Sequence, residues 1–293
     1  MSFREGYIAV DWGTTNRRAY AVDGDGGVTA SFEDELGLMA VPRGGFEAAA
    51  AEIRERLGDR PMLLAGMVGS NRGWREAPYA PCPATTRDLA AALLWIEPGR
   101  TAIVPGVCQA GAAGADVMRG EEVQVLGAAA AGLVPRNSLI CHPGTHSKWI
   151  CMTGARIDSF RTMMTGELFS LLRKHSILAD QLQGDVETDA SFLAGAAAGL
   201  EGQELLSTLF GIRARHVLGE ERGDAAAYAS GLLIGSDVRA GLRLHREGVI
   251  ALIGRPKLCV LYAAALAAAG RESVEVDGAA AFLAGIHLLT ETL

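Results

Sequence analysis

Asp11-Trp12-Gly13-Thr14-Thr15-Asn16 forms a polar turn between two apolar runs. Residues 7–10 are apolar, and residues 18–22 have apolar side chains at alternate positions, which predicts a β-hairpin. A Gly-rich turn at 23–27 and an apolar run at 28–32 add a third strand. We therefore expect a three-stranded antiparallel meander at the N-terminus.

A second hairpin of the same kind begins the other half of the chain. Its turn, Pro143-Gly144-Thr145-His146, lies between apolar runs at 139–142 and 147–152, and a third run follows. Each meander is succeeded by alternating helical and extended patterns. The repeat predicts two similar α/β domains, 1–134 and 135–293, that face each other across a central cleft.

The remaining elements follow from the spacing of apolar residues. Helical spacing predicts helices, and short apolar runs between turn signals predict strands. The predicted helices cover 46–57, 86–95, 121–132, 167–178, 190–200, 204–218, 225–246, 256–269 and 279–289, and the predicted strands cover 62–65, 101–104, 249–253 and 273–276.

Composition sets the broad class of protein. The chain has 293 residues, of which 49% are hydrophobic and 21% charged, as in folded globular proteins. The first residues lack an apolar signal-peptide core, and no uncharged stretch reaches the roughly 18 residues that span a bilayer. We expect a cytoplasmic protein without a membrane partner.

The net charge of −7 and the scattered arginines argue against nucleic acid as a partner. The sequence leaves open whether the protein forms a homo-oligomer.

Several common binding and catalytic motifs are missing. The five cysteines include no C-x-x-C pair, which argues against a disulfide framework or a zinc knuckle. None of the three lysines, Lys148, Lys174 and Lys257, follows a glycine, so the chain has no Gly-Lys-Ser/Thr phosphate loop. The G-x-G-x-x-G and G-x-S-x-G motifs are missing too, which argues against a dehydrogenase or a hydrolase. Any nucleotide must be held in another way.

The two Gly-Thr turns are candidate phosphate-binding sites. Asp11 ends a strand, where its carboxylate can order Mg²⁺ while Gly13 lets the backbone approach phosphate oxygens. N–H groups and hydroxyls of Thr14-Thr15-Asn16 and of Gly144-Thr145-His146-Ser147 can hold a polyphosphate. Alone, the first turn is equally well an Asx-turn that closes a hairpin. Its repetition favours phosphate binding.

Lys148 follows the second turn in a chain with only three lysines among 27 basic residues. It either places a point charge near phosphate or blunts a strand edge, and both interpretations stay open. His142 and His146 are four residues apart, but the Pro-Gly between them prevents a helical metal-binding pair. We expect structural or hydrogen-bonding roles for both histidines.

Three carboxylates are candidates for a catalytic base. Phosphoryl transfer to an alcohol needs one carboxylate that orients and deprotonates the hydroxyl. Glu121 opens an Ala-rich helix and is the preferred candidate, with Glu122 and Asp116 as alternatives. The favourable effect of a helix dipole on first-turn carboxylates would explain the two glutamates equally well.

A loop after the strand at 62–65 is rich in groups that can hold an acidic sugar. It runs Asn71-Arg72-Gly73-Trp74-Arg75-Glu76-Ala77-Pro78-Tyr79, and Arg72 or Arg75 can clamp a carboxylate with two hydrogen bonds. The alternative is a surface loop with its aromatic residues tucked inward. Arg161 and Thr165 lie in a comparable loop of the second half.

The combination of motifs resembles the 2-dehydro-3-deoxygalactonokinase family. The resemblance covers about residues 7–288 and is carried by these stretches: D-W-G-T-T-N at 11–16, A-G-M-V-G-S-N-R-G-W at 65–74, A-P-Y at 77–79, D-V-M-R-G-E-E at 116–122, P-G-T-H-S-K-W at 143–149, F-R-T-M-M-T-G-E-L at 160–168 and S-G-L-L-I-G at 230–235.

The resemblance implies two actin-like, ribonuclease H-like ATPase domains that bind Mg-ATP and phosphorylate the 6-hydroxyl of 2-dehydro-3-deoxy-D-galactonate. It places phosphate contacts at Asp11–Asn16 and Gly144–Lys148, and adenosine contacts at Gly254. Arg255-Pro256 departs from the double glycine of relatives, and many sugar kinases have aspartate where this chain has Glu121. Two alternatives remain: a kinase of another sugar or sugar acid, and a nucleotide-gated regulatory ATPase.

Overall fold

The computed structural model describes residues 2–111, 114–220, 223–245 and 248–293, which pack into two compact units. The first unit consists of Met1–Arg136, Thr153–Ser159 and Gly278–Leu293, and the second of Asn137–Met152 and Phe160–Asp277. The first division lies two residues from the boundary predicted at 134/135. The C-terminal segment groups with the first unit, whereas the sequence assigned it to the second domain.

The first unit contains a six-stranded sheet with the order β3-β2-β1-β4-β7-β6. Its first three strands form the expected antiparallel meander, and β4 and β7 continue the sheet in parallel. Strands β1 and β4 are almost entirely buried because they lie in the centre of the sheet. The strand bounds are β1 Gly6–Trp12, β2 Arg17–Asp23, β3 Val28–Asp34, β4 Met62–Gly66, β6 Leu94–Glu97 and β7 Thr101–Ile103.

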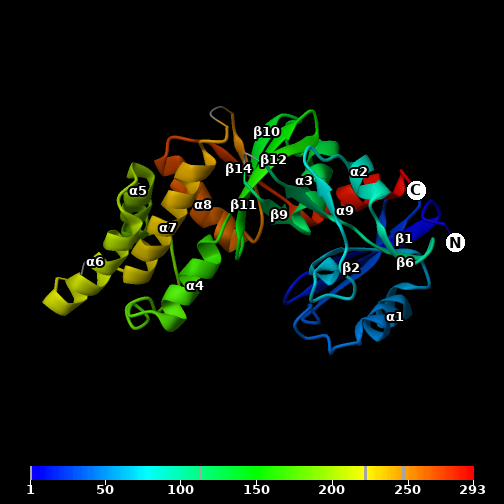
Figure 1. The fold of residues 1–293 in the computed structure, drawn as a ribbon, viewed down its shortest axis with the longest axis horizontal. Coiled ribbons are helices and arrows are strands. Elements are labelled where there is room, and N and C mark those ends of the chain that lie inside the picture. Colours follow the sequence, from blue (N-terminus) through cyan, green and yellow to red (C-terminus); the bar gives the residue numbers. More distant parts are fainter. Residues whose placement is uncertain (1, 112–113, 221–222, 246–247) are drawn as a thin grey trace. The chain divides into compact units, whose positions relative to one another are not determined.

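Helices cover this sheet, and a small second sheet extends the unit (Figure 1). Helix α1 buries Phe46, Ala49, Ala50, Ile53 and Leu57, whose spacing forms one helical face. The helices are α1 Phe46–Leu57, α2 Thr86–Ala91, α3 Glu121–Ala130 and α9 Gly278–Thr290, with a short 3₁₀ turn, η1, at Met67–Gly69. The small sheet has the order β5-β8-β9, with bounds Tyr79–Pro81, Gly106–Gln109 and Asp116–Met118.

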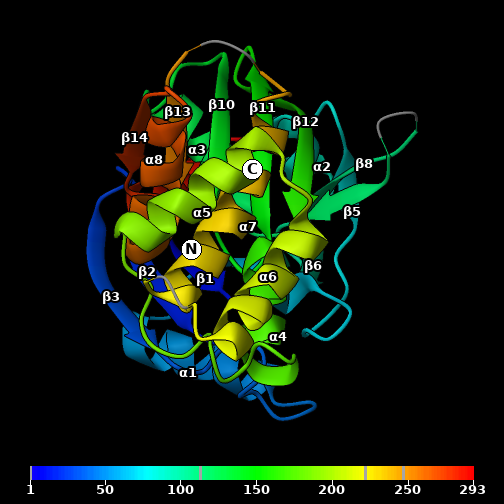
Figure 2. The same cartoon turned by 90° about the vertical axis from the view of Figure 1, so that its left-hand side faces the viewer.

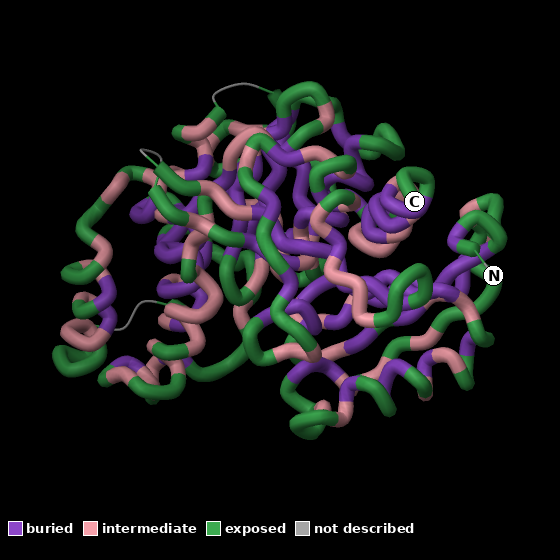
Figure 3. The backbone as a smooth tube through the Cα atoms, turned by 45° about the vertical axis from the view of Figure 1, so that its right-hand side comes forward, coloured by how far each residue is buried: buried purple, intermediate pink, exposed green. Residues whose placement is uncertain are grey.

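Helix α9 packs tightly on α3 through two glycines. A Cβ added to Gly127 would lie 2.0 Å from the carbonyl oxygen of Ala281, and one added to Gly285 would lie 2.1 Å from that of Val123. Only glycine permits such a close approach of two helix backbones. In Figure 3, α9, next to the C label, is buried or half-buried over most of its length.

The second unit contains a five-stranded sheet with the order β12-β11-β10-β13-β14. Strand β10 pairs antiparallel with β11 and parallel with β13. The strands are β10 Ser138–His142, β11 Ser147–Thr153, β12 Arg156–Met163, β13 Ile250–Ile253 and β14 Ser273–Val276. The helices, drawn together in Figure 2, are α4 Thr165–His175, α5 Ala190–Glu201, α6 Leu205–Leu218, α7 Ala225–Gly241 and α8 Pro256–Ala268.

The two large sheets share one topology. In each, a three-stranded run in reverse chain order is followed by two parallel strands, the first of which pairs parallel to the first strand of the run. The sheet of the first unit has β6 as an additional antiparallel edge strand. This match confirms the predicted α/β fold with a duplicated actin-like domain. Among the described residues, every helix is too short or too polar to span a lipid bilayer.

Some predicted boundaries were wrong. The helix predicted over 86–95 ends at Ala91, and residues 94–97 form β6. The helix predicted to reach 246 ends at Gly241, and Arg246 lies outside the described residues. A Cβ at Gly241 would lie 2.1 Å from the ring of Trp149, so this glycine serves helix packing on β11. The small sheet was not predicted.

Candidate active site

Asp11 lies near the carboxyl end of the central strand of the first unit. It pairs in register with Arg18 on β2 and with Ala65 on β4. Burial raises the pKa of the Asp11 carboxyl to about 6; Arg18 opposes the shift, and the charges of Glu121 and Glu33 add to it. A desolvated carboxylate with few compensating charges is stabilised by a cation that binds beside it.

The first Gly-Thr turn is held rigidly by the segment that follows β3. The carbonyl oxygens of residues 13–15 accept hydrogen bonds of 2.9–3.2 Å from the N–H groups of residues 37–39. A Cβ at Gly37 would lie 2.3 Å from the carbonyl carbon of Thr15, so this contact requires glycine. Within the described residues, the N–H groups of Thr14 and Thr15 donate to no protein acceptor. Such groups are suited to an anion.

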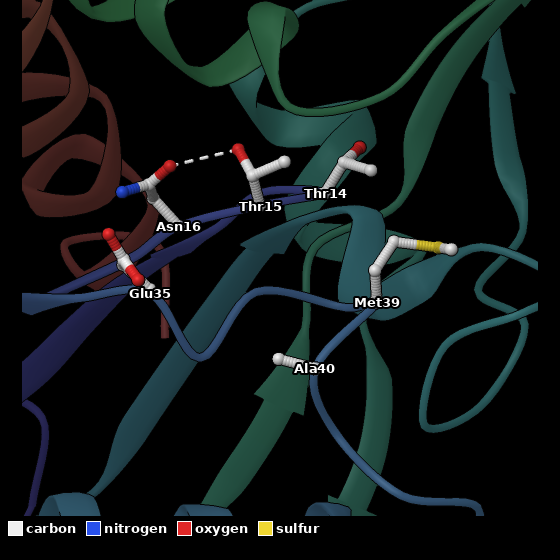
Figure 4. Close-up of a pocket in the computed structure, with 6 residues that line it drawn as sticks. All are labelled: Thr14, Thr15, Asn16, Glu35, Met39 and Ala40. Atoms are coloured by element: carbon white, nitrogen blue, oxygen red, sulfur yellow. Dashed lines mark hydrogen bonds between the residues drawn. The ribbon is translucent and has the colours of Figure 1, made fainter.

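An open pocket of about 350 Å³ lies at this turn (Figure 4). Within it, the Thr15 hydroxyl donates to Oδ1 of Asn16 over 2.8 Å. Hydroxyl and amide groups at a pocket wall suit a polar ligand such as a phosphate chain. The pocket is lined by Thr14, Thr15, Asn16, Glu35, Met39 and Ala40. The last three were not predicted, because no motif marks them.

Glu121 begins helix α3 beside the carboxyl end of β4. Gly120 precedes it with a φ of +105°, and a Cβ there would lie 3.2 Å from the Cα of Gly66. This approach of loop to strand requires glycine. The half-buried Glu121 side chain accepts a hydrogen bond of 3.1 Å from the N–H of Arg119, and its charge acts on Asp11. Asp11 and Glu121 therefore lie close enough in the first unit for their charges to interact.

The two alternative bases occupy different surroundings. Glu122 is fully buried, and both of its carboxylate oxygens accept from the N–H of Gly120, at 2.9 and 2.7 Å. Asp116 lies on β9 opposite Gln109, and its Oδ1 accepts from the N–H of Val117. A base must reach the hydroxyl of its substrate. The fully buried Glu122 is thus poorly placed, whereas Glu121 and Asp116 are only partly buried.

We expect Glu122→Gln to stabilise the protein at alkaline pH. Burial raises the pKa of Glu122 from 4.5 to about 8, and the nearby Glu121 charge adds to the shift. The stability that this group contributes is complete below about pH 4.5 and is lost as the pH rises through about 8. Thermal unfolding between pH 5 and 9 should show a Tm advantage of the variant that grows with pH. A pH-independent difference would contradict the assignment.

The predicted sugar-acid loop folds tightly back on the turn after β4. The N–H of Trp74 donates to the Val68 carbonyl over 2.8 Å, and a Cβ at Gly73 would lie 2.0 Å from that same oxygen. The Trp74 ring stacks on Phe46, with 6.5 Å between centroids. Trp74 therefore belongs to the edge of the core. The exposed residues of the loop include Asn71, Arg72 and Arg75.

Arg119 fixes the end of this loop, and the sequence analysis missed it. Its side chain is 9% exposed, Nη2 donates to the Ala77 carbonyl over 2.7 Å, and the guanidinium lies 4.3 Å above the Tyr79 ring. Nε and Nη1 have no partner among the described residues. Because Arg119 is two residues before Glu121, it ties the loop to the start of α3.

The second Gly-Thr turn lies against the beginning of helix α4 in the second unit. A Cβ at Gly166 would lie 2.5 Å from the Gly144 carbonyl oxygen, and the N–H of Glu167 donates to the Thr145 carbonyl over 2.8 Å. Nε2 of His146 lies 2.5 Å from a Glu167 carboxylate oxygen. The turn and the first residues of α4 thus form one compact structure.

The other predicted residues of the second unit are distributed around this turn. The buried Ser147 and the half-buried Thr165 both donate through their hydroxyls to Asp237, which the sequence analysis missed. Lys148 is 6% exposed. Gly254 follows β13, and a Cβ there would lie 3.0 Å from the Pro143 carbonyl oxygen, so its turn adjoins the second Gly-Thr turn. Arg161 is exposed on β12.

Two similar α/β units, each with a Gly-Thr turn after its first strand, define an ATPase fold of the actin-like class. Residues 11–289 match the family model of 2-keto-3-deoxy-galactonokinase, and the chain belongs to that family. The resemblance inferred from the motifs is thereby confirmed.

Known relatives cover nearly the whole chain. The 2-dehydro-3-deoxygalactonokinase of Escherichia coli (strain K12) is 38% identical over 292 residues, which are 98% of each chain. A crystal structure from Sinorhizobium meliloti, described as a 2-dehydro-3-deoxygalactonokinase protein, has a TM-score of 0.89 and 32% identity over 98% of this chain and 97% of that chain. The activator of 2-hydroxyisocaproyl-CoA dehydratase from Clostridium difficile shares the fold, with a TM-score of 0.52 and 10% identity over 98% and 94% of the two chains.

Proposed function

We propose that the protein transfers the γ-phosphoryl group of ATP to the 6-hydroxyl of 2-dehydro-3-deoxy-D-galactonate. Membership of the 2-keto-3-deoxy-galactonokinase family carries this proposal. The site chemistry supports it, because Asp11 and Glu121 supply the carboxylates that phosphoryl transfer to an alcohol requires. The reaction consumes ATP, and we propose a cytoplasmic location for it.

Each group has a role in this reaction. Glu121 accepts the proton of the 6-hydroxyl as the oxygen attacks the γ-phosphorus, and the bond from that phosphorus to the β-phosphate oxygen breaks to release ADP. The N–H groups and hydroxyls of Thr14, Thr15 and Asn16 bind phosphate oxygens. The turn Gly144–Lys148 does the same from the second unit, and the turn at Gly254 contacts adenosine.

The residues around Asp11 fit a magnesium ion. Magnesium in kinases is typically held by one or two carboxylates together with phosphate oxygens and water. Burial raises the pKa of Asp11 to about 6, and the charge of Arg18 offsets this shift only in part. No group of three or more His, Cys, Asp or Glu side chains that could hold a metal occurs in the described ranges. We infer that Asp11 would hold Mg²⁺, which neutralises phosphate charge when bound.

We expect Arg72→Ala to raise the KM for the sugar acid with little change in the KM for ATP. The carboxylate of the sugar acid would lose a charged hydrogen bond worth about 1.5–3 kcal/mol, which corresponds to an increase in KM of roughly 10- to 150-fold. Arg75→Ala tests the second candidate. A lysine at the responsible position should restore binding only partly, because the ammonium group is a point charge and cannot form the two parallel hydrogen bonds of a guanidinium. If both alanine variants keep the wild-type KM, the carboxylate is bound elsewhere, with Arg161 and Thr165 next.

Substrate-dependent ATP turnover tests the proposed function. The purified protein should consume ATP rapidly with 2-dehydro-3-deoxy-D-galactonate and slowly without it. Faster turnover with another sugar or sugar acid would support the alternative kinase. Turnover that no sugar acid stimulates would support a nucleotide-gated regulatory ATPase.

A further inference from the structure

Asp237 is a buried carboxylate on helix α7 that accepts four side-chain hydrogen bonds. It is 4% exposed, within a helix whose neighbouring residues are mostly apolar. Its donors are the Ser147 hydroxyl, Nε1 of Trp149 at 2.5 Å, the Thr165 hydroxyl at 2.5 Å and the Tyr262 hydroxyl at 2.6 Å. A carboxylate offers about four acceptor sites, and four side-chain donors point at this one.

The donors come from three elements that are far apart in the sequence. Ser147 and Trp149 lie on β11, Thr165 is the first residue of α4, and Tyr262 lies on α8. Oδ2 accepts from the three hydroxyls, whereas Oδ1 accepts from the indole. One carboxylate therefore joins a strand and two helices to α7.

Two of these donors hold the second Gly-Thr turn from its two sides. Ser147 directly follows the turn, and Thr165 directly precedes Gly166, whose backbone packs on Gly144 and Thr145. The bond from the Glu167 N–H to the Thr145 carbonyl closes the same structure. If the Asp237 bonds were lost, β11 and the start of α4 would be free to shift independently.

We propose that Asp237 is a positioning residue, which fixes the second Gly-Thr turn against the start of α4 so that the turn is preorganised for ATP phosphates. The proposal rests on the proposed phosphate-binding role of residues 144–148. Preorganised N–H groups bind an anion more tightly because no ordering is needed upon binding. Asp237 itself touches no phosphate in this proposal.

The chain offers a matched pair of variants for the test. Thr165→Val removes a hydroxyl that links Asp237 to the turn, and Tyr262→Phe removes one that links the same oxygen to α8 instead. Both changes nearly preserve side-chain shape. We expect Thr165→Val to weaken binding of a non-hydrolysable ATP analogue roughly tenfold, equivalent to about 1.4 kcal/mol, and Tyr262→Phe to change it less than about twofold at a similar loss of Tm. Thr165→Ser, which keeps the hydroxyl, should restore binding.

Calorimetry with the ATP analogue provides the readout, so the result does not depend on which sugar acid the enzyme accepts. The proposed function would fail separately, through a wild-type protein that does not phosphorylate the sugar acid. Equal losses of analogue affinity in Thr165→Val and Tyr262→Phe would overturn the positioning role, as would wild-type affinity in Thr165→Val. A raised sugar-acid KM with unchanged analogue affinity would also overturn it and would make Thr165 a substrate ligand. If Thr165→Val does not fold, Thr165→Ala, which also removes the hydroxyl, takes its place in the comparison.

Discussion

Asp11→Asn should remove nearly all turnover while leaving the protein folded. The amide keeps the shape of the side chain but loses the charge that would hold Mg²⁺ and offset the phosphate charges, and we expect kcat to fall by about 10³-fold or more. At the same time the variant should be more stable than the wild type at pH 8. The folded-state pKa of about 6 exceeds the ordinary value of 3.8, so the stability contributed by this group is lost as the pH rises through 6.

A carboxylate that serves the reaction and not the fold should leave the protein more stable when it is replaced, and the expected gain in the free energy of unfolding can be calculated for Asp11→Asn. The shift corresponds to at most about 3 kcal/mol at pH 8 and to almost nothing below pH 4. Thermal unfolding at both pH values, alongside steady-state kinetics, measures both effects. Glu33→Gln is the control, because Glu33 also acts on Asp11 but lies exposed in an ion pair with Arg18. Near-normal kcat in Asp11→Asn at moderate Mg²⁺ would refute the role of Asp11.

Glu121→Gln should give the second largest effect. Loss of a general base typically lowers kcat by about 10²–10⁴-fold, and we expect this fall with little change in ATP affinity. The side chain is half-buried and accepts a hydrogen bond from the Arg119 N–H, which the amide oxygen can keep. Single-turnover kinetics together with analogue binding would separate the chemical step from binding.

Glu122→Gln and Asp116→Asn are the matched controls for this experiment. Glu122 is buried against Gly120, and Asp116 lies on the small sheet, so neither change should reproduce the kinetic pattern. If either one does, the base is that residue and not Glu121. A normal kcat in all three variants would mean that no side chain of this segment takes the proton.

The parts of the fold that could be predicted are those encoded over short stretches of chain. The turns at 11–16 and 143–146 lie between runs of strand periodicity, and both meanders form as expected. The small sheet could not be predicted, because its strands YAP, GVCQ and DVM are three or four residues long and contain Pro, Gly, Gln or Asp, so they form neither an apolar run nor a periodic pattern. The helix predicted over 86–95 was too long because the apolar residues at 94–96 extend the apolar composition of the helix, although they belong to β6.

The candidate site shows the same limit. Asp11, Glu121 and the turn residues carry local motifs, and the sequence analysis selected them. Arg119 and Asp237 were missed because their partners are 42 and up to 90 residues away. One signal was available for Asp237: a charged residue in the middle of a largely apolar helical stretch needs partners in the folded protein.

The position of helix α9 has a consequence for biosynthesis. The chain passes between the two units at 136/137, 152/153, 159/160 and 277/278, and α9 packs on α3 through Gly127 and Gly285. A ribosome delivers α9 after every element of the second unit has been made. The unit that contains Asp11 and Glu121 is therefore begun first and completed last, and no nascent chain that lacks α9 can carry a finished first unit.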